Sequence, residues 1–175
     1  PTLPLMLAGP VYKGRALAER VGVPANIVLD HGHAAGRRMR DYAPFSNPQR
    51  HHAALLVECG QHWAQSSVDV ARQTMIRFLV ATGTGDASMI DDWLGPDTPP
   101  RQRVIEVTNP ITVRNATFNF VKPYIGMEVI PKAGTLLAMD GDTPVYTPHD
   151  DCVLIMPSRR LTRGQTAVRL GKVVD

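Results

Sequence analysis

The sequence predicts an α/β domain followed by a small all-β domain, and three observations support this. In residues 1–95, short apolar runs alternate with amphipathic helical patterns, as in α/β proteins. In residues 101–175, many short apolar or alternating runs are separated by turn residues, which is typical of a β barrel or sandwich. Between them, Gly95, Pro96, Pro99 and Pro100 favour a domain boundary.

The first domain begins with a strand, a turn and a helix. Residues 3–8 form an apolar run, and residues 13–21 follow with apolar side chains at helical spacing. Gly22 and Pro24 are typical of the end of that helix. Residues 26–29 form a second apolar run, so we predict a second strand there.

A longer helix is predicted over residues 66–80. Ser66 or Ser67 is a suitable N-cap, and Gly83 is a suitable end. Apolar residues recur at spacings of three and four, which gives one continuous apolar stripe. That stripe, which we expect to be core, comprises Val68, Ala71, Met75, Phe78 and Leu79.

The β domain is divided by turn residues at short, even intervals. The expected strands cover residues 104–107, 111–113, 117–121, 128–130, 135–139, 153–156 and 166–170. The expected turns lie at Asn109-Pro110, Lys122-Pro123, Lys132-Ala133-Gly134, Asp140-Gly141-Asp142 and Arg163-Gly164.

The most informative stretch is residues 54–63. Residues 55–57 are apolar without polar alternation, which predicts a strand covered on both faces. Glu58 follows where that strand should leave the sheet, and ligand sites of open α/β sheets gather at the carboxyl ends of strands. We interpret Glu58 as a candidate general base and His62 as a second titratable group that contacts substrate. The alternative is a structural carboxylate, either a charge at the N-terminus of a helix or half of an ion pair.

A second polar stretch follows the second predicted strand, in residues 30–42. His31 and His33 could chelate a metal from an extended segment, and Arg37 and Arg38 could bind a substrate carboxylate through bidentate hydrogen bonds. A solvated surface loop is the alternative interpretation.

Composition excludes several classes of protein. The net charge is +3, and the basic residues are scattered without interleaved aromatic residues, so a nucleic-acid surface is not expected. No apolar run approaches the roughly 20 residues of a membrane span, and no signal peptide is recognised. Two cysteines do not make a disulfide framework, so we expect a cytoplasmic protein.

Four stretches together resemble the succinylglutamate desuccinylase and aspartoacylase family of zinc hydrolases. They are Leu5-Met6-Leu7-Ala8-Gly9-Pro10, the loop of residues 32–42, Glu-Cys-Gly-Gln-His-Trp at residues 58–63, and the segment of residues 148–157. The resemblance implies part of a zinc carboxypeptidase-like mixed-sheet α/β domain, followed by a small all-β domain. It also implies a deacylase that hydrolyses the linear amide of N-acyl amino acids.

The resemblance implies that Glu58 activates a zinc-bound water. The family takes two zinc ligands from a His and a Glu separated by two residues, and the third from another His. None of the six histidines here has a Glu three residues later, so no metal ligand is assigned and the zinc site is expected in a segment before Pro1. We therefore expect this chain to be an incomplete, inactive part of such an enzyme.

The acyl group and the amino acid of the substrate stay open. The expected partner is a small-molecule N-acyl amino acid, with no nucleic acid and no membrane, and a homo-oligomer is left open. Succinylglutamate, acetylaspartate and acetyldiaminobutyrate are all compatible with the resemblance.

Three other interpretations remain. Cys59, His62, His149 and Cys152 have the spacing of a structural Cys₂His₂ zinc site. Cys59 could be a catalytic nucleophile. The chain could also be a non-catalytic binding or assembly module built on a hydrolase scaffold.

Overall fold

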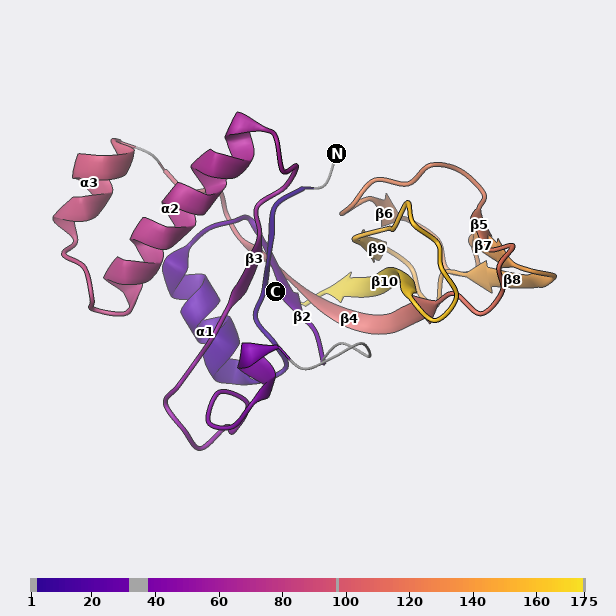
Figure 1. The fold of residues 1–175 in the computed structure, drawn as a ribbon, viewed down its shortest axis with the longest axis horizontal. Coiled ribbons are helices and arrows are strands. Elements are labelled where there is room, and N and C mark those ends of the chain that lie inside the picture. Colours follow the sequence, from indigo (N-terminus) through magenta and orange to yellow (C-terminus); the bar gives the residue numbers. More distant parts are fainter. Residues whose placement is uncertain (1–2, 32–37, 97, 175) are drawn as a thin grey trace. The chain divides into compact units, whose positions relative to one another are not determined.

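The computed structural model describes residues 3–31, 38–96 and 98–174. The chain separates into two compact units, residues 3–104 and residues 105–174 (Figure 1). The predicted fold class is confirmed, because a mixed α/β unit is followed by an all-β unit. None of the described helices is both long and apolar enough to cross a membrane.

The first unit is built on three short strands in the order β3-β1-β2. Strand β1 (Leu5–Leu7) runs parallel to β2 (Asn26–Leu29) and antiparallel to β3 (Leu56–Glu58). The central positions of β1 and β2 are fully buried, with Met6, Ile27 and Val28 at 0% exposure. The sheet is therefore mixed, as the resemblance implied.

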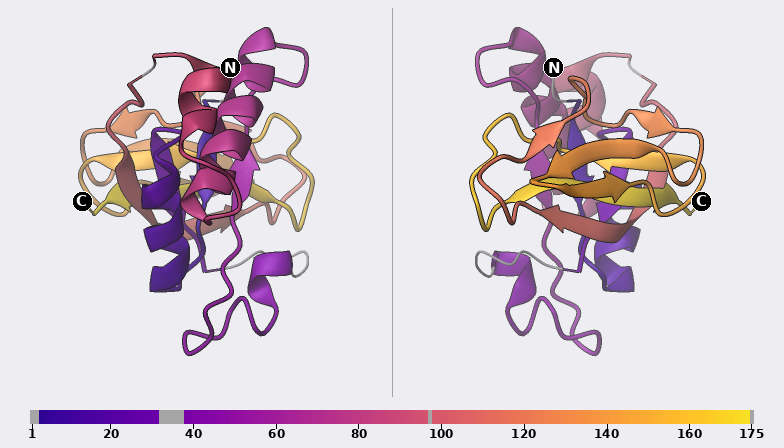
Figure 2. Two further views of the ribbon diagram at one scale, coloured as in Figure 1. Left: turned by 90° about the vertical axis from the view of Figure 1, so that its left-hand side faces the viewer. Right: turned by 90° about the vertical axis from the view of Figure 1, so that its right-hand side faces the viewer.

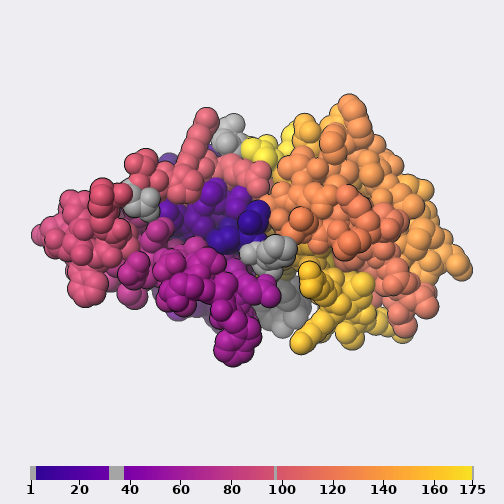
Figure 3. Space-filling model, turned by 90° about the horizontal axis from the view of Figure 1, so that it is seen from above, coloured from indigo at the N-terminus to yellow at the C-terminus, as the bar shows by residue number. Residues whose placement is uncertain are grey.

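Three α-helices complete the first unit: α1 (Tyr12–Val21), α2 (Gln65–Ala81) and α3 (Ser88–Leu94). Helices α1 and α2 pack against each other and lie on one side of the three strands (Figures 1 and 2). A short 3₁₀ helix, η1 (Met39–Asp41), follows β2. Helix α3 has no buried residue and forms an outer surface, at the left of the space-filling view in Figure 3.

Several predictions for this unit are wrong in detail. Strand β3 is only partly buried, because it is an edge strand of its sheet instead of an inner one. Helix α2 begins after Ala64, and the hydroxyl of Ser67 donates to the carbonyl of Gln61 instead of capping the helix. Helix α3 was not predicted, because the glycine and prolines that follow it dominate that stretch.

The second unit is a two-layer β sandwich, as predicted. Its first sheet has the order β4-β10-β9-β6, formed by Arg103–Thr112, Thr166–Val173, Cys152–Ile155 and Val129–Ile130. Its second sheet has the order β5-β7-β8, formed by Asn119–Phe120, Leu136–Asp140 and Thr143–Tyr146. Leu137 from one sheet packs with Leu154 and Leu170 from the other, so one hydrophobic core joins both layers.

The predicted turn at Asn109-Pro110 is wrong, because β4 continues through it. Pro110 is paired with Arg169 of β10, and the register shifts between Leu170 and Gly171 of that strand. Such an irregularity lets a strand accommodate a residue that cannot donate a backbone hydrogen bond. Strand β8 was also missed, because Pro144 obscures its short apolar pattern.

The start of β4 is tied to the first unit. The backbone N–H of Arg103 donates to the carbonyl of Ala25 over 2.9 Å, and its guanidinium donates to the side chain of Asn26 over 2.7 Å. The first unit therefore extends to Val104, whereas the sequence placed its end at residue 95.

Helix α1 approaches the end of β1 too closely for any side chain at Gly14. A Cβ atom there would overlap the carbonyl oxygen of Ala8. We expect Gly14→Ala to destabilise the protein by about 1–3 kcal/mol through this overlap, although alanine favours a helix by about 1 kcal/mol. Urea unfolding followed by circular dichroism measures the effect.

Gly126→Ala is the matched control for Gly14→Ala. A Cβ at Gly126 would meet only Pro157, at 4.0 Å. That substitution should change the free energy of unfolding by less than about 0.5 kcal/mol. Equal stability of the two variants would show that the close approach at Gly14 does not affect the free energy of unfolding.

Candidate functional site

Glu58 is the last residue of β3, and its side chain leaves the sheet on the face away from α2. Leu55, Val57 and Cys59 line an apolar groove beneath that helix. Because side chains alternate along a strand, Glu58 projects from the opposite face. The register of the sheet agrees, since Glu58 lies directly across from Leu5, and Val57 lies across from Met6 of the groove.

The Glu58 carboxylate is half-buried, and it has no hydrogen-bond or ion-pair partner in the described part of the chain. Within residues 3–31, 38–96 and 98–174, no hydrogen bond or ion pair engages it. Gly60 follows with φ 116°, a conformation that residues with a side chain rarely adopt, and the chain turns there. The carboxylate is thus positioned by a strand while both oxygens stay available to accept a proton or a hydrogen bond.

His62 follows Glu58 in the exposed segment that leads into α2. Its neighbour Trp63 is 95% exposed. The segment is held by a hydrogen bond from the backbone N–H of Ala64 to the carbonyl of Gln61. His62 is therefore accessible close in sequence to Glu58, and its contact with a substrate stays a prediction.

Arg38 lies in a separate ion-pair cluster beyond the end of β2. Its guanidinium is 3.5 Å from Asp30, and the guanidinium of Arg40 is 3.6 Å from the same carboxylate oxygen. The backbone N–H of Arg38 donates to Asp41 over 2.9 Å. Asp30 is only 3% exposed, so the two arginines neutralise a buried charge.

The direction of β3 separates Glu58 from this cluster. Because β3 is antiparallel to β1, its carboxyl end lies beside Leu5, at the start of β1. Asp30 and Arg38 follow the carboxyl end of β2, which is parallel to β1. The two polar groups therefore lie at opposite ends of the same sheet and do not form one site. Arg37 and His33 lie outside the described residues.

The environment of Cys59 disfavours a thiolate. Burial raises the pKa of its thiol, and the negative charge of Glu58 raises it further. A nucleophilic cysteine needs the opposite shift, towards a lower pKa. The Cys59-nucleophile interpretation therefore loses support.

The residues of the second predicted zinc pair have other partners. Cys152 is a fully buried member of the sandwich core. His149 is 3.1 Å from the hydroxyl of Thr108 and 2.9 Å from the carbonyl of Asp150. Among the residues that the structure describes, no three His, Cys, Asp or Glu side chains are grouped so that they could hold a metal. The zinc ion that the resemblance implies thus finds no fitting set of ligands in this part of the chain.

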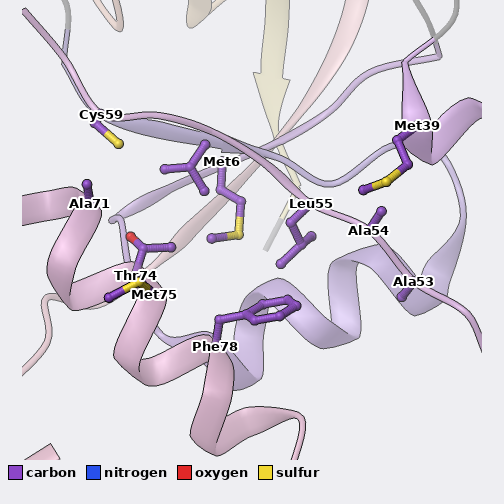
Figure 4. A pocket seen from close by; sticks show the side chains of 11 residues that line it. Met6, Met39, Ala53, Ala54, Leu55, Cys59, Ala71, Thr74, Met75 and Phe78 are labelled. Atoms are coloured by element: carbon purple, nitrogen blue, oxygen red, sulfur yellow. The ribbon is translucent and has the colours of Figure 1, made fainter. Parts of the chain in front are cut away.

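The sequence analysis missed an apolar groove of about 400 Å³ between α2 and the strands (Figure 4). It is lined by Met6, Met39, Ala53, Ala54, Leu55, Val57, Cys59, Ala71, Thr74, Met75 and Phe78. The apolar stripe predicted on α2 was the available signal, but that stripe was assigned to the core. Val68 and Met75 are instead 57% and 58% exposed, and Ala71 is exposed as well, so the prediction is wrong for these three residues.

Comparison with family models and with curated proteins gives no match. Comparison with solved structures gives matches. Succinylglutamate desuccinylase from Vibrio cholerae matches 99% of this chain and 50% of its own, with a TM-score of 0.66 and 16% identity. The fold is that of the desuccinylase and aspartoacylase structures.

Two further structures support this conclusion. A succinylglutamate desuccinylase/aspartoacylase from Rhodobacter sphaeroides matches 99% of this chain and 55% of its own, with a TM-score of 0.62 and 12% identity. The product-bound ectoine utilization protein EutE (DoeB) from Ruegeria pomeroyi matches 97% and 53%, with a TM-score of 0.63 and 13% identity. The chain spans about half the length of the structures that it matches.

The pKa of Cys59 provides a direct measure of the Glu58 charge. Glu58→Gln removes the negative charge, so the thiol pKa should fall and the thiolate fraction at a given pH should rise. The rate of alkylation of Cys59 by iodoacetamide should then increase, and its pH profile should shift to lower pH. Mass spectrometry distinguishes Cys59 from the buried Cys152.

Asp142→Asn, which removes an exposed carboxylate in the sandwich, is the control and should leave the alkylation profile of Cys59 unchanged. An unchanged alkylation profile in Glu58→Gln would show that the charge of Glu58 does not raise the pKa of the Cys59 thiol.

Proposed function

We propose that this chain supplies the general base of a zinc-dependent deacylase that acts on N-acyl amino acids. The observation that carries the proposal is Glu58, a half-buried carboxylate at the end of β3 with no ion-pair partner among the described residues, in a fold shared with desuccinylase structures. A carboxylate so placed can take a proton from water and deliver it to a departing amine. The same residue can thereby serve both halves of an amide hydrolysis.

Zinc would supply Lewis-acid chemistry in such a hydrolase. The described residues do not form a site for it, so in this proposal its ligands come from polypeptide outside them. We assign no metal-binding role to any residue named above.

The names of the proteins with this fold support the proposed substrate class. Their names include a succinylglutamate desuccinylase, a desuccinylase/aspartoacylase and an ectoine utilization protein. Because these names differ in acyl group and in amino acid, the proposal extends to N-acyl amino acids as a class. Within it, His62 is the described residue best placed to contact a substrate held near Glu58.

A non-catalytic binding or assembly module is the second candidate. The open groove beside α2 favours it, since an apolar surface of this kind serves to bind a partner whether or not the assembly is an enzyme. The hydrolase requires Glu58 for activity, whereas the binding module does not. Substitution of Glu58 therefore distinguishes the two candidate functions.

The 175-residue chain alone should be inactive. Incubated with zinc and a panel of N-succinyl and N-acetyl amino acids, it should release no free amine above background, because its described residues hold no metal group. Turnover by the isolated chain that is lost on chelation would contradict this.

In an assembly that contains this chain and is active, Glu58→Gln should lower kcat by about 10²–10⁴-fold, as expected for the loss of a general base. Zinc content, measured by atomic emission, should be retained because Glu58 is not proposed as a ligand. The control is Glu19→Gln, since Glu19 pairs with Arg15 on the surface of α1. Full activity in the Glu58 variant would favour the binding module.

A further inference from the structure

We propose that Lys13 is a positioning residue for Glu58. Its ammonium group bonds the loop of residues 43–52, here called the 43–52 loop, to the start of α1, and this attachment fixes how β3 is aligned along β1. The inference deepens the proposed function and rests on it for the catalytic role of Glu58, whereas the attachment itself is tested without any activity.

The ammonium of Lys13 is bonded to three backbone carbonyls of the 43–52 loop, which lies at the same end of the first unit as the start of α1 (Figures 1 and 2). The Nζ atom donates to the carbonyls of Pro44, Asn47 and Arg50 over 3.0, 2.7 and 3.0 Å. A lysine ammonium has three N–H donors and no acceptor, so these bonds use all of them. The loop therefore folds around one cation, and Lys13 supplies it.

Lys13 occupies a helix position that does not favour a positive charge. It is the second residue of α1, and the N-terminus of a helix carries a partial positive charge from its unpaired N–H groups. The first turn of α1 contains no acidic residue, and Val11 provides no side-chain cap. The three carbonyls supply the negative dipole ends that offset the charge. The 43–52 loop, and not the helix, therefore accounts for a lysine at this position.

The backbone beside Lys13 is fixed relative to β1. Its neighbour Gly14 lies so close to the end of β1 that a Cβ atom there would overlap the carbonyl oxygen of Ala8. Ala8 in turn donates its backbone N–H to the carbonyl of Val28 over 3.0 Å, so it is held against the sheet. The side chain of Lys13 thus transmits the position of β1 to the 43–52 loop.

Lys13 makes the hydrogen bonds that attach the 43–52 loop to the rest of the unit. The remaining hydrogen bonds of the loop are local and lie within residues 42–50. Within the described ranges of the chain, no other hydrogen bond joins this loop to a helix or a strand. Removal of the ammonium would therefore leave the loop with its turns but without its polar attachment.

Strand β3 needs this attachment because its own pairing defines its position weakly. It has three residues, all only partly buried. The alternation of side chains opposes a shift by one residue, which would turn Glu58 into the apolar groove. A shift by two residues keeps every side chain on its face, yet it moves Glu58 by roughly 7 Å along β1. The residue pattern of β3 does not exclude that shift, whereas a fixed loop before the strand does.

The connection between the 43–52 loop and β3 is short. Arg50 is followed after five residues by Leu56, the first residue of β3, and Ala54 between them is 9% exposed. The connection is therefore packed against the unit and does not form a free loop that would absorb the shift. A hydrogen bond is lost once it lengthens by about 1 Å. The bonds of Lys13 accordingly hold β3 in the observed register.

Hydrogen exchange of β3 tests this attachment directly. Lys13→Met keeps a long side chain but removes its charge and its donors. In this variant the backbone amides of residues 56–58 should exchange about tenfold faster, because local opening governs exchange. Burial raises the pKa of the Cys59 thiol, so a loosened β3 should also speed the alkylation of Cys59 by iodoacetamide by about threefold. Alkylation of Cys152, in the sandwich core, should not change.

Chemical rescue distinguishes the ammonium bonds from a general loss of stability. In Lys13→Ala the missing atoms match those of n-propylammonium, which brings three N–H donors to the three carbonyls. Added n-propylammonium should slow the exchange of residues 56–58 towards the wild-type rate. Tetramethylammonium carries the same charge without an N–H group, so it should have no effect at the same ionic strength.

Two further variants serve as controls. Lys132→Met removes an ammonium of the sandwich unit that is 81% exposed and 3.8 Å from Asp150, and it should leave the exchange of residues 56–58 unchanged. Lys13→Arg retains the charge, but a planar guanidinium does not direct three N–H groups at the same three carbonyls. Exchange should therefore still be faster than in the wild type, and this variant keeps the test usable if Lys13→Met does not fold.

Three outcomes contradict the inference. The first is equal exchange of residues 56–58 in the wild type, Lys13→Met and Lys13→Arg. The second is equal acceleration of alkylation at Cys59 and Cys152, because the substitution would then act on the stability of the whole chain. The third is equal slowing of exchange in Lys13→Ala by both ammonium ions, because the carbonyls would then not require N–H donors.

The outcome is separable from that of the proposed activity. In an active assembly that contains this chain, Lys13→Met should lower kcat by about tenfold or more with little change in KM, because a displaced base loses its alignment. Faster exchange of β3 in a protein that is inert towards N-acyl amino acids would retain the positioning role and reject the hydrolase. Turnover that is lost in Glu58→Gln but unchanged in Lys13→Met would do the reverse.

Discussion

The antiparallel pairing of β3 with β1 is the constraint on which the rest of the first unit depends. It sets Val57 opposite Met6 on the side of α2, and Glu58 opposite Leu5 on the other side. One three-residue strand thus supplies an apolar lining to one face and a carboxylate to the other. A shift of one residue in this register would place Glu58 in the groove and Val57 on the opposite face.

Sequence periodicity predicted where the elements lie better than how they are oriented. The strand at residues 26–29 and the helix ending at Val21 were located closely, because apolar spacing and a following Gly22 are local signals. The direction of β3 has no such signal, since an apolar run reads the same in a parallel or an antiparallel strand. The sequence therefore did not define whether Asp30 and Glu58 lie at the same edge, and the structure places them at opposite ends of the strands.

Sequence periodicity also predicts the apolar face of an element better than it predicts whether that face is buried. A 3.6-residue repeat identifies the apolar face of α2, but it does not say what covers that face. Fully burying a side chain such as Met75 or Val68 is worth roughly 1.5–3 kcal/mol, against a typical total stability of about 5–15 kcal/mol for a domain. When two such residues stay exposed on one helix face, the domain lacks a stabilisation that is a substantial fraction of its total stability. The discrepancy between predicted core and observed surface is therefore itself an indication of a binding face.

Asp30 and Glu58 show why a carboxylate at the end of a strand cannot be assigned a role from sequence alone. Asp30 is almost fully buried, and its charge is compatible with folding because Arg38 and Arg40 lie within 3.5 and 3.6 Å of it. Glu58 is only half-buried, so water can solvate its charge without an arginine, and no described protein group immobilises it. An ion-paired carboxylate cannot accept a proton without breaking the network that keeps it buried. An unpaired one at a strand end can, and that difference in pairing, more than position in the chain, is why we propose Glu58 for proton transfer.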